Sequence, residues 1–176
     1  MYPVLLEGSA VMLRELTDTD SAALHKVYGN DEATRHLSFE PRTADQVAGI
    51  VSAAIRSAAA APRTEYMVAV AGKDEELIGA ARLATGEHES ATIGFALRLD
   101  QWGQGKGLET VRLLRRLGFT ELGLHRIWGA RSPLNEASAR TLQAAGMIEE
   151  GTIRGQPRAP VHARGMAGLR GPLHPA

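Results

Sequence analysis

The spacing of apolar residues along the chain predicts short strands and amphipathic helices. Alternating apolar positions indicate a strand, as in Thr92–Arg98, where every second residue is Ile, Phe or Leu. Apolar residues at helical spacing indicate a helix, as at Leu108, Val111 and Leu114. The predicted strands are 11–14, 66–70, 77–83, 92–98, 126–130 and 147–153, and the predicted helices are 22–28, 44–60, 108–117 and 135–145. This order predicts an α+β fold and not a doubly wound sheet.

A glycine-rich segment joins one predicted strand to one predicted helix. Gly103, Gly105 and Gly107 alternate with Gln104 and Lys106. Glycine permits positive φ angles and close approach of a ligand to the backbone. The first turn of the following helix adds unpaired N–H donors and the positive end of the helix dipole. The segment therefore favours an anion site, most often for phosphate. The alternative is a plain strand–turn–helix connection, for which one glycine would serve.

Spacing excludes the two commoner nucleotide motifs. A Walker loop requires Ser or Thr after its Gly-Lys pair, but Lys106 is followed by Gly107. A dinucleotide fingerprint that starts at Gly103 requires a third glycine where Leu108 stands. The spacing of Gly105 and Gly107 instead resembles the acyl-CoA pyrophosphate loop of the GCN5-related N-acetyltransferase (GNAT) family, Gln/Arg-x-x-Gly-x-Gly/Ala.

Further residues carry this resemblance beyond the loop. Trp102 replaces the leading Gln or Arg, and the pattern that ends at Glu109 resembles the RimJ/RimL-like ribosomal-protein alanine acetyltransferases of the family. The likeness extends from about residue 13 to residue 151. It includes the Leu13-Arg14 pair of the first predicted strand and an Asn-x-x-Ser segment at 135–138.

The resemblance implies a fold and an activity. It implies a single N-acetyltransferase domain over residues 1–176, with a mixed, mostly antiparallel central sheet flanked by helices. Strands 92–98 and 126–130 would splay apart and leave a slot for acyl-CoA. The implied activity is acetyl-CoA-dependent transfer of an acetyl group to a primary amine, on a small molecule or a protein N-terminus, by direct attack in a ternary complex. The alternative is an acyl-CoA-binding or sensing member with little or no turnover.

The same resemblance assigns roles to residues. Backbone N–H groups of 104–109 would hold the CoA pyrophosphate, and the main chain of 97–99 would pair with the pantetheine arm. Asn135 would hydrogen-bond the pantetheine, Ser138 would assist the leaving thiolate, and Arg140 would contact the adenosine phosphates. The expected cofactor-binding residues are Leu97, Arg98, Leu99, Gln104, Gly105, Lys106, Gly107, Leu108, Glu109, Asn135 and Arg140, and the expected catalytic residues are Ser138 and Asn135. Helix capping is the alternative for Asn135 and Ser138, and a solvated helix face is the alternative for Arg140.

A general base is harder to identify. Acetyl transfer requires a neutral amine, so a base must remove a proton directly or through water. The family often has an acid where Thr92 stands, and the ribosomal-protein enzymes have a glutamate near the position of Pro157. The remaining candidates, each of which could equally be a solvated loop residue, are Glu87, His88, Glu89, His36 and Glu40.

Composition narrows the possible partners. The formal net charge of zero argues against a nucleic-acid or anionic-membrane surface. The absence of cysteine excludes disulfides, a thiolate metal site and a cysteine nucleophile. No signal peptide or span of about 20 apolar residues is seen. We therefore expect a cytoplasmic protein that binds no nucleic acid or membrane. The resemblance implies that it binds acetyl-CoA and an amine, needs no metal, and is a monomer or homodimer.

The C-terminal tail, residues 155–176, departs from the family pattern. Relatives usually end with a strand that completes the sheet, but residues 165–176 contain two prolines and three glycines, which predict a poor strand. A neighbouring reading frame can encode a typical last strand, so we hypothesise that roughly the last ten residues derive from a frameshift.

Overall fold

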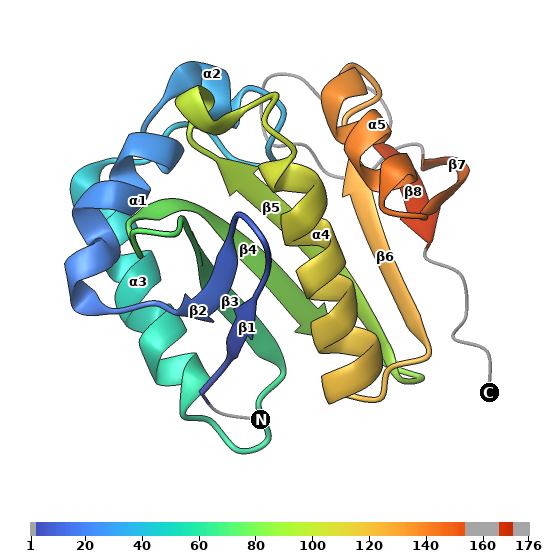
Figure 1. Ribbon diagram of the computed structural model, residues 1–176, viewed down its shortest axis with the longest axis horizontal. Helices are drawn as coiled ribbons and strands as arrows, with labels where there is room; N and C mark the ends of the chain where they lie inside the picture. The colour runs from blue at the N-terminus through green and yellow to red at the C-terminus, as the bar shows by residue number, and fades with distance from the viewer. Residues whose placement is uncertain (1–2, 154–165, 171–176) are drawn as a thin grey trace.

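The computed structural model, which describes residues 3–153 and 166–170, is built on an eight-stranded sheet in the order β1-β2-β3-β4-β5-β6-β8-β7 (Figure 1). The strands are β1 (Leu5–Glu7), β2 (Met12–Glu15), β3 (Glu65–Ala71), β4 (Leu77–Thr85), β5 (Ser90–Leu97), β6 (Arg126–Arg131), β7 (Ile148–Ile153) and β8 (Met166–Arg170). Neighbouring strands are antiparallel except for the parallel pair β5–β6. The predicted α+β class with a mixed, mostly antiparallel sheet is confirmed.

Helices cover both faces of this sheet. They are α1 (Ser21–Tyr28), α2 (Asp31–Thr34), α3 (Ala44–Ala58), α4 (Lys106–Arg116) and α5 (Glu136–Ala144), with single turns η1 (Asp18–Asp20), η2 (Leu99–Gln101) and η3 (Leu117–Glu121). In Figure 1, α4 crosses the front of the sheet, and α1 and α3 lie together at its left side. Two apolar clusters result: one packs Val111 and Leu114 of α4 with Ile93 of β5, and the other packs Leu24 and Val47 against the opposite face.

Local sequence explains where the helices begin. Thr43 and Gln46 form the predicted capping box at the start of α3, with the Gln46 N–H donating to Thr43 Oγ1 at 3.3 Å. Asp20, only 5% exposed, accepts a bidentate ion pair from Arg14 at 2.8 and 2.9 Å. It also accepts the Thr17 N–H at 2.8 Å. The opening strand is thereby tied to the first helical turn.

The parallel pair β5–β6 opens along its length. Register pairs join Ser90–Thr92 to residues 126–128. Beyond Thr92, β5 continues to Leu97 beside β4, whereas β6 continues to Arg131 beside β8. Figure 1 shows the two strands diverging toward the end of the sheet at which α4 and α5 begin. The predicted splay is therefore present.

The prediction of a poor last strand is wrong for part of the tail. Met166–Arg170 forms β8, which inserts between β6 and β7 and pairs antiparallel with both. The strand forms because β6 and β7 supply ladder partners on both sides, and no proline among these five residues removes a backbone N–H from either ladder. The strand predicted as last, β7, therefore lies at the edge of the sheet. The prolines of the tail and residues 154–165 lie outside the described residues.

Candidate functional site

The glycine loop ends at the start of α4, where β5 and β6 diverge (Figure 1). Gly103 and Gly105 have positive φ angles of 72° and 77°, as predicted. A Cβ at either position would meet nothing within 4 Å. The backbone N–H groups of Lys106, Gly107 and Leu108 form the first turn of α4 and donate to no acceptor within the described residues. They form an open cradle of donors at the positive end of the helix dipole.

Gly107 serves a different purpose from the other two glycines. It lies inside α4 and does not use the positive φ that glycine permits. The helix begins at Lys106, two residues before the predicted Leu108. A Cβ on Gly107 would lie 3.3 Å from Phe95 Cε2 and 3.7 Å from Thr141 Cγ2. Glycine at this position therefore lets the first turn of α4 pack closely against β5 and α5.

Two predicted loop residues make contacts other than those expected. The Glu109 N–H donates to Gly105 O at 3.1 Å, which closes the first turn of the helix. It is therefore not an open donor for a ligand. Its carboxylate accepts hydrogen bonds from the turn between β1 and β2. The Gln104 side chain donates to Asp100 O at 2.7 Å, which braces the loop from within.

More backbone groups at the end of β5 are hydrogen-bonded within the protein than the sequence indicated. The Arg98 N–H donates to Ile78 O on β4 at 2.9 Å, and Leu99 O accepts the Trp102 N–H at 3.1 Å. The Trp102 indole donates to Leu97 O at 2.9 Å. Because polar groups alternate along an antiparallel strand, the groups that point away from β4 belong to Leu97 and Phe95. Since the Trp102 indole occupies Leu97 O, the main-chain groups that can face the gap are those of Phe95 and the N–H of Leu97.

The start of α5 lies across from the loop. Asn135 is the N-cap, and its Oδ1 accepts the Ser138 N–H at 3.0 Å, so the capping interpretation of Asn135 holds. The amide nitrogen of Asn135 and the Ser138 hydroxyl make no hydrogen bond within the described residues. Ser138 shares a helix face with Thr141, whose methyl group faces Gly107. The half-buried side chains of Asn135 and Ser138 thus each keep a polar group that can bind a ligand.

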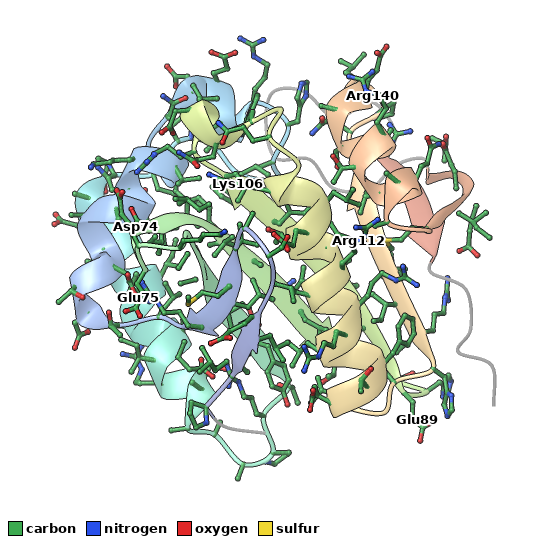
Figure 2. All side chains as sticks on the ribbon, viewed as in Figure 1. Asp74, Glu75, Glu89, Lys106, Arg112 and Arg140 are labelled. Atoms are coloured by element: carbon green, nitrogen blue, oxygen red, sulfur yellow. The ribbon has the colours of Figure 1, made fainter. Side chains whose placement is uncertain are left out.

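Arg140 points outward. Figure 2 labels Arg140 on α5 and Lys106 at the start of α4. The Arg140 side chain is 73% exposed and pairs with Glu136 at 3.5 Å, one helical turn away. This geometry is that of a solvated helix face, the alternative given above.

Charged side chains around the loop are mostly compensated. Arg98 forms ion pairs with Asp100 at 2.7 Å and with Glu76 at 2.8 Å. The hydrogen bonds from Arg98 lower the pKa of Asp100 to about 2. The Lys106 ammonium donates a hydrogen bond to Gln101 Oε1. A cavity of about 540 Å³ adjoins these groups, lined by Ala10, Gly72, Lys73, Asp74, Glu76, Ile78, Arg98, Gln101 and Lys106. Arg98 is therefore neutralised by carboxylates, whereas Lys106 has a neutral amide as its partner and no ion pair within the described residues. Anion recognition at the cradle can thus draw on the backbone N–H groups and on Lys106.

The candidate bases Glu87, His88 and Glu89 lie far from the cradle. They form the turn between β4 and β5, and Glu89 O accepts the His125 N–H at 2.9 Å before β6 begins. All eight residues of β5 separate this turn from the loop, a length of about 23 Å. Figure 2 shows Glu89 and Lys106 at opposite ends of the molecule. The structure therefore does not bring these three residues to the diverging strands.

The other two candidate bases lie in the connection between α2 and α3. His36 is half-buried there, whereas Glu40 is exposed. In Figure 1, α2 lies at the same end of the molecule as the glycine loop.

Sequence reasoning missed several structural partners of the site, namely Phe95, Thr141 and the Gly8–Val11 turn. The only signal for that turn was a Gly-Ser-Ala run, which nothing in the sequence connects to Glu109.

Two features are absent from the described part of the chain. Within the described part of the chain, no helix combines the length and apolar character needed to span a membrane. Among residues 3–153 and 166–170, no group of three or more His, Cys, Asp or Glu side chains is arranged to hold a metal ion.

Known proteins share this chain's sequence pattern. The family model of the acetyltransferase (GNAT) domain matches residues 10–148. The uncharacterized N-acetyltransferase YoaA of Bacillus subtilis (strain 168) is 31% identical over 159 residues, which cover 88% of each chain.

Solved structures share the fold. Mycobacterium smegmatis RimJ, in complex with CoA-disulfide, has a TM-score of 0.81 at 21% identity, covering 96% of this chain and 87% of that one. Spermidine N-acetyltransferase from Vibrio cholerae, in complex with CoA and spermine, has a TM-score of 0.79 at 20% identity, covering 93% and 95% of the two chains. The matched domain spans the diverging strands, the glycine loop and the start of α5, and the chain belongs to the GNAT family of acetyltransferases.

Proposed function

We propose that this protein is an acetyl-CoA-dependent N-acetyltransferase that acts on a primary amine by direct attack within a ternary complex. The observation that carries the proposal is the open donor cradle of Lys106, Gly107 and Leu108 beside the gap between β5 and β6. The relatives that bind CoA or spermine support the cofactor and an amine acceptor.

The cradle fits a pyrophosphate. Its three N–H donors lie at the positive end of α4, and the space beside Gly105 is clear of protein atoms to 4 Å. Within the gap, the main-chain groups of Phe95 and the N–H of Leu97 would pair with the amides of the pantetheine arm. Asn135 would add its amide N–H₂ donors from α5. When bound, acetyl-CoA supplies the activated acetyl thioester.

The protein's own groups then have two tasks at the reacting end. The Ser138 hydroxyl would donate a hydrogen bond or a proton to the departing sulfur, which stabilises the developing thiolate. The acceptor must present a neutral amine, because an ammonium has no lone pair. Thr92, at the last register pair before the strands diverge, cannot serve as a carboxylate base. A base therefore comes from elsewhere in the chain or acts through water.

A thiol-release assay tests this proposal. The purified protein is incubated with acetyl-CoA and a panel that contains polyamines, small aminated compounds and peptides with free N-termini. We expect release of free CoA thiol that depends on one class of amine, with acetylated product detected by mass spectrometry. No release with any amine, together with no binding of CoA, would contradict the proposal.

A second candidate function is acyl-CoA binding without turnover. It is favoured by Thr92, which stands at the edge of the gap where relatives often carry an acid. The same assay separates the two functions. Binding of CoA with no amine-dependent thiol release would identify a sensor.

A further inference from the structure

Glu109 is an acidic residue in the first turn of α4, next to a cradle that should receive an anion. Its carboxylate accepts four hydrogen bonds from the turn between β1 and β2. The donors are the N–H and hydroxyl of Ser9, the hydroxyl at 2.7 Å, and the N–H groups of Ala10 and Val11 at 2.8 and 3.0 Å. Three successive backbone N–H groups thus converge on one side chain about a hundred residues away.

The turn is shaped for this carboxylate. The Gly8 N–H donates to Val11 O at 2.9 Å, which closes the turn. A Cβ on Gly8 would lie 2.6 Å from Glu109 Oε1, so only glycine lets the carboxylate approach. Burial alone would raise the pKa of Glu109, but the hydrogen bonds from Ser9, Ala10 and Val11 outweigh it and hold that pKa below its ordinary value. The carboxylate is therefore ionised at neutral pH.

The same residue also closes the helix turn that carries the cradle. The Glu109 N–H donates to Gly105 O at 3.1 Å, so the backbone of Glu109 is one end of the turn formed by Lys106, Gly107 and Leu108. Its side chain is anchored to a turn that the sheet holds on both sides, through the β1–β2 pair Glu7↔Met12. A movement of that anchor would therefore move the three open N–H groups.

We propose that Glu109 is a positioning residue: it ties the first turn of α4 to the β1–β2 turn and so fixes the N–H groups that bind the CoA pyrophosphate, without touching the cofactor itself. The inference rests on the proposed function. It also explains an acid beside an anion site, because four donors already satisfy the negative charge and hold it toward the β1–β2 turn.

The substitution Glu109→Gln tests the role. Glutamine keeps only one acceptor oxygen, so its amide nitrogen must face either the donors of Ser9 or those of Ala10 and Val11, and it cannot accept from them. The anchor is thereby weakened while side-chain size is kept. The matched control is Glu136→Gln, which removes the same charge from the first turn of α5, where the side chain is exposed. We expect about tenfold weaker CoA binding and a similarly raised KM for acetyl-CoA in Glu109→Gln. We expect kcat within about threefold of wild type, and no loss of affinity in the control.

A second readout needs no ligand. Amide hydrogen exchange at residues 109–112, whose N–H groups are hydrogen-bonded in the first turns of α4, should be faster in ligand-free Glu109→Gln than in the wild type, and unchanged in Glu136→Gln. If Glu109→Gln does not fold, Ser9→Ala removes one donor and leaves the backbone donors in place. We then expect CoA binding about two- to threefold weaker.

The outcomes separate this inference from the function on which it rests. A folded Glu109→Gln, or a Ser9→Ala protein in its place, with wild-type CoA affinity and wild-type exchange at residues 109–112 would overturn the positioning role and leave the proposed function standing. A wild-type protein that does not bind CoA would overturn both.

Discussion

At the scale of single residues, the glycines of the loop have separate physical tasks. Gly103 and Gly105 adopt φ angles of 72° and 77°, which cost an L-residue about 1–2 kcal/mol each. Gly107 adopts helical backbone and is required only for space, because Phe95 and Thr141 lie where a Cβ would point. The anion cradle therefore depends on the backbone at Gly105 and on the packing at Gly107.

The substitution Gly105→Ala separates backbone strain from ligand binding. Gly103→Ala is the matched control, because both glycines have similar positive φ and open space at the Cβ position. We expect both variants to lose about 1 kcal/mol of unfolding free energy in urea. Only Gly105→Ala, which adjoins the open N–H groups, should lose CoA affinity, by about tenfold or more in calorimetric titration. Equal CoA affinity in the two variants would place the phosphate elsewhere.

At the scale of elements, the start of α5 combines two roles in one side chain. Asn135 caps the helix through Oδ1, and its amide nitrogen is left for a ligand. The sequence could not decide between capping and cofactor contact, because asparagine is suited to both. The structure confirms the cap and leaves the cofactor contact as a prediction.

Asn135→Asp distinguishes those roles. Aspartate caps helices as well as asparagine does, so we expect the melting temperature to stay within about 2 °C of wild type. The lost N–H₂ donors and the added negative charge should raise the KM for acetyl-CoA about fivefold or more. A wild-type KM would show that Asn135 serves only as the cap.

Local patterns predicted most elements, and long-range pairing explains those that were missed. The capping box of Thr43 and Gln46 located α3, since both partners lie within one turn. The strand β8 was missed because its stability comes from partners on both sides and not from its own composition. Likewise, the loop spacing predicted the cradle, but the Glu109 anchor joins residues too distant in sequence for any local pattern to connect.

At the scale of the whole molecule, the sheet continues beyond the diverging strands β5 and β6 into β8 and β7. β8 supports β6, one wall of the gap, and is the partner through which β7 joins the sheet. The gap between β5 and β6 is thus connected to β8 through the β6–β8 ladder.

Truncation after residue 165 tests this dependence. Loss of β8 leaves β6 and β7 without their shared partner, and we expect the melting temperature to fall by roughly 10 °C or more. A chain that ends at residue 170 keeps β8 and serves as the control. An equal melting temperature for the two truncated chains would show that β8 does not stabilise the sheet.

The central claim is that acetyl-CoA binds with its pyrophosphate on the first turn of α4. Backbone amide NMR of the ¹⁵N-labelled protein during titration with CoA measures this directly. We predict that the largest shifts occur at Lys106, Gly107 and Leu108, whose N–H groups are open in the free protein. Saturable binding with unshifted amides at these three residues would contradict the account.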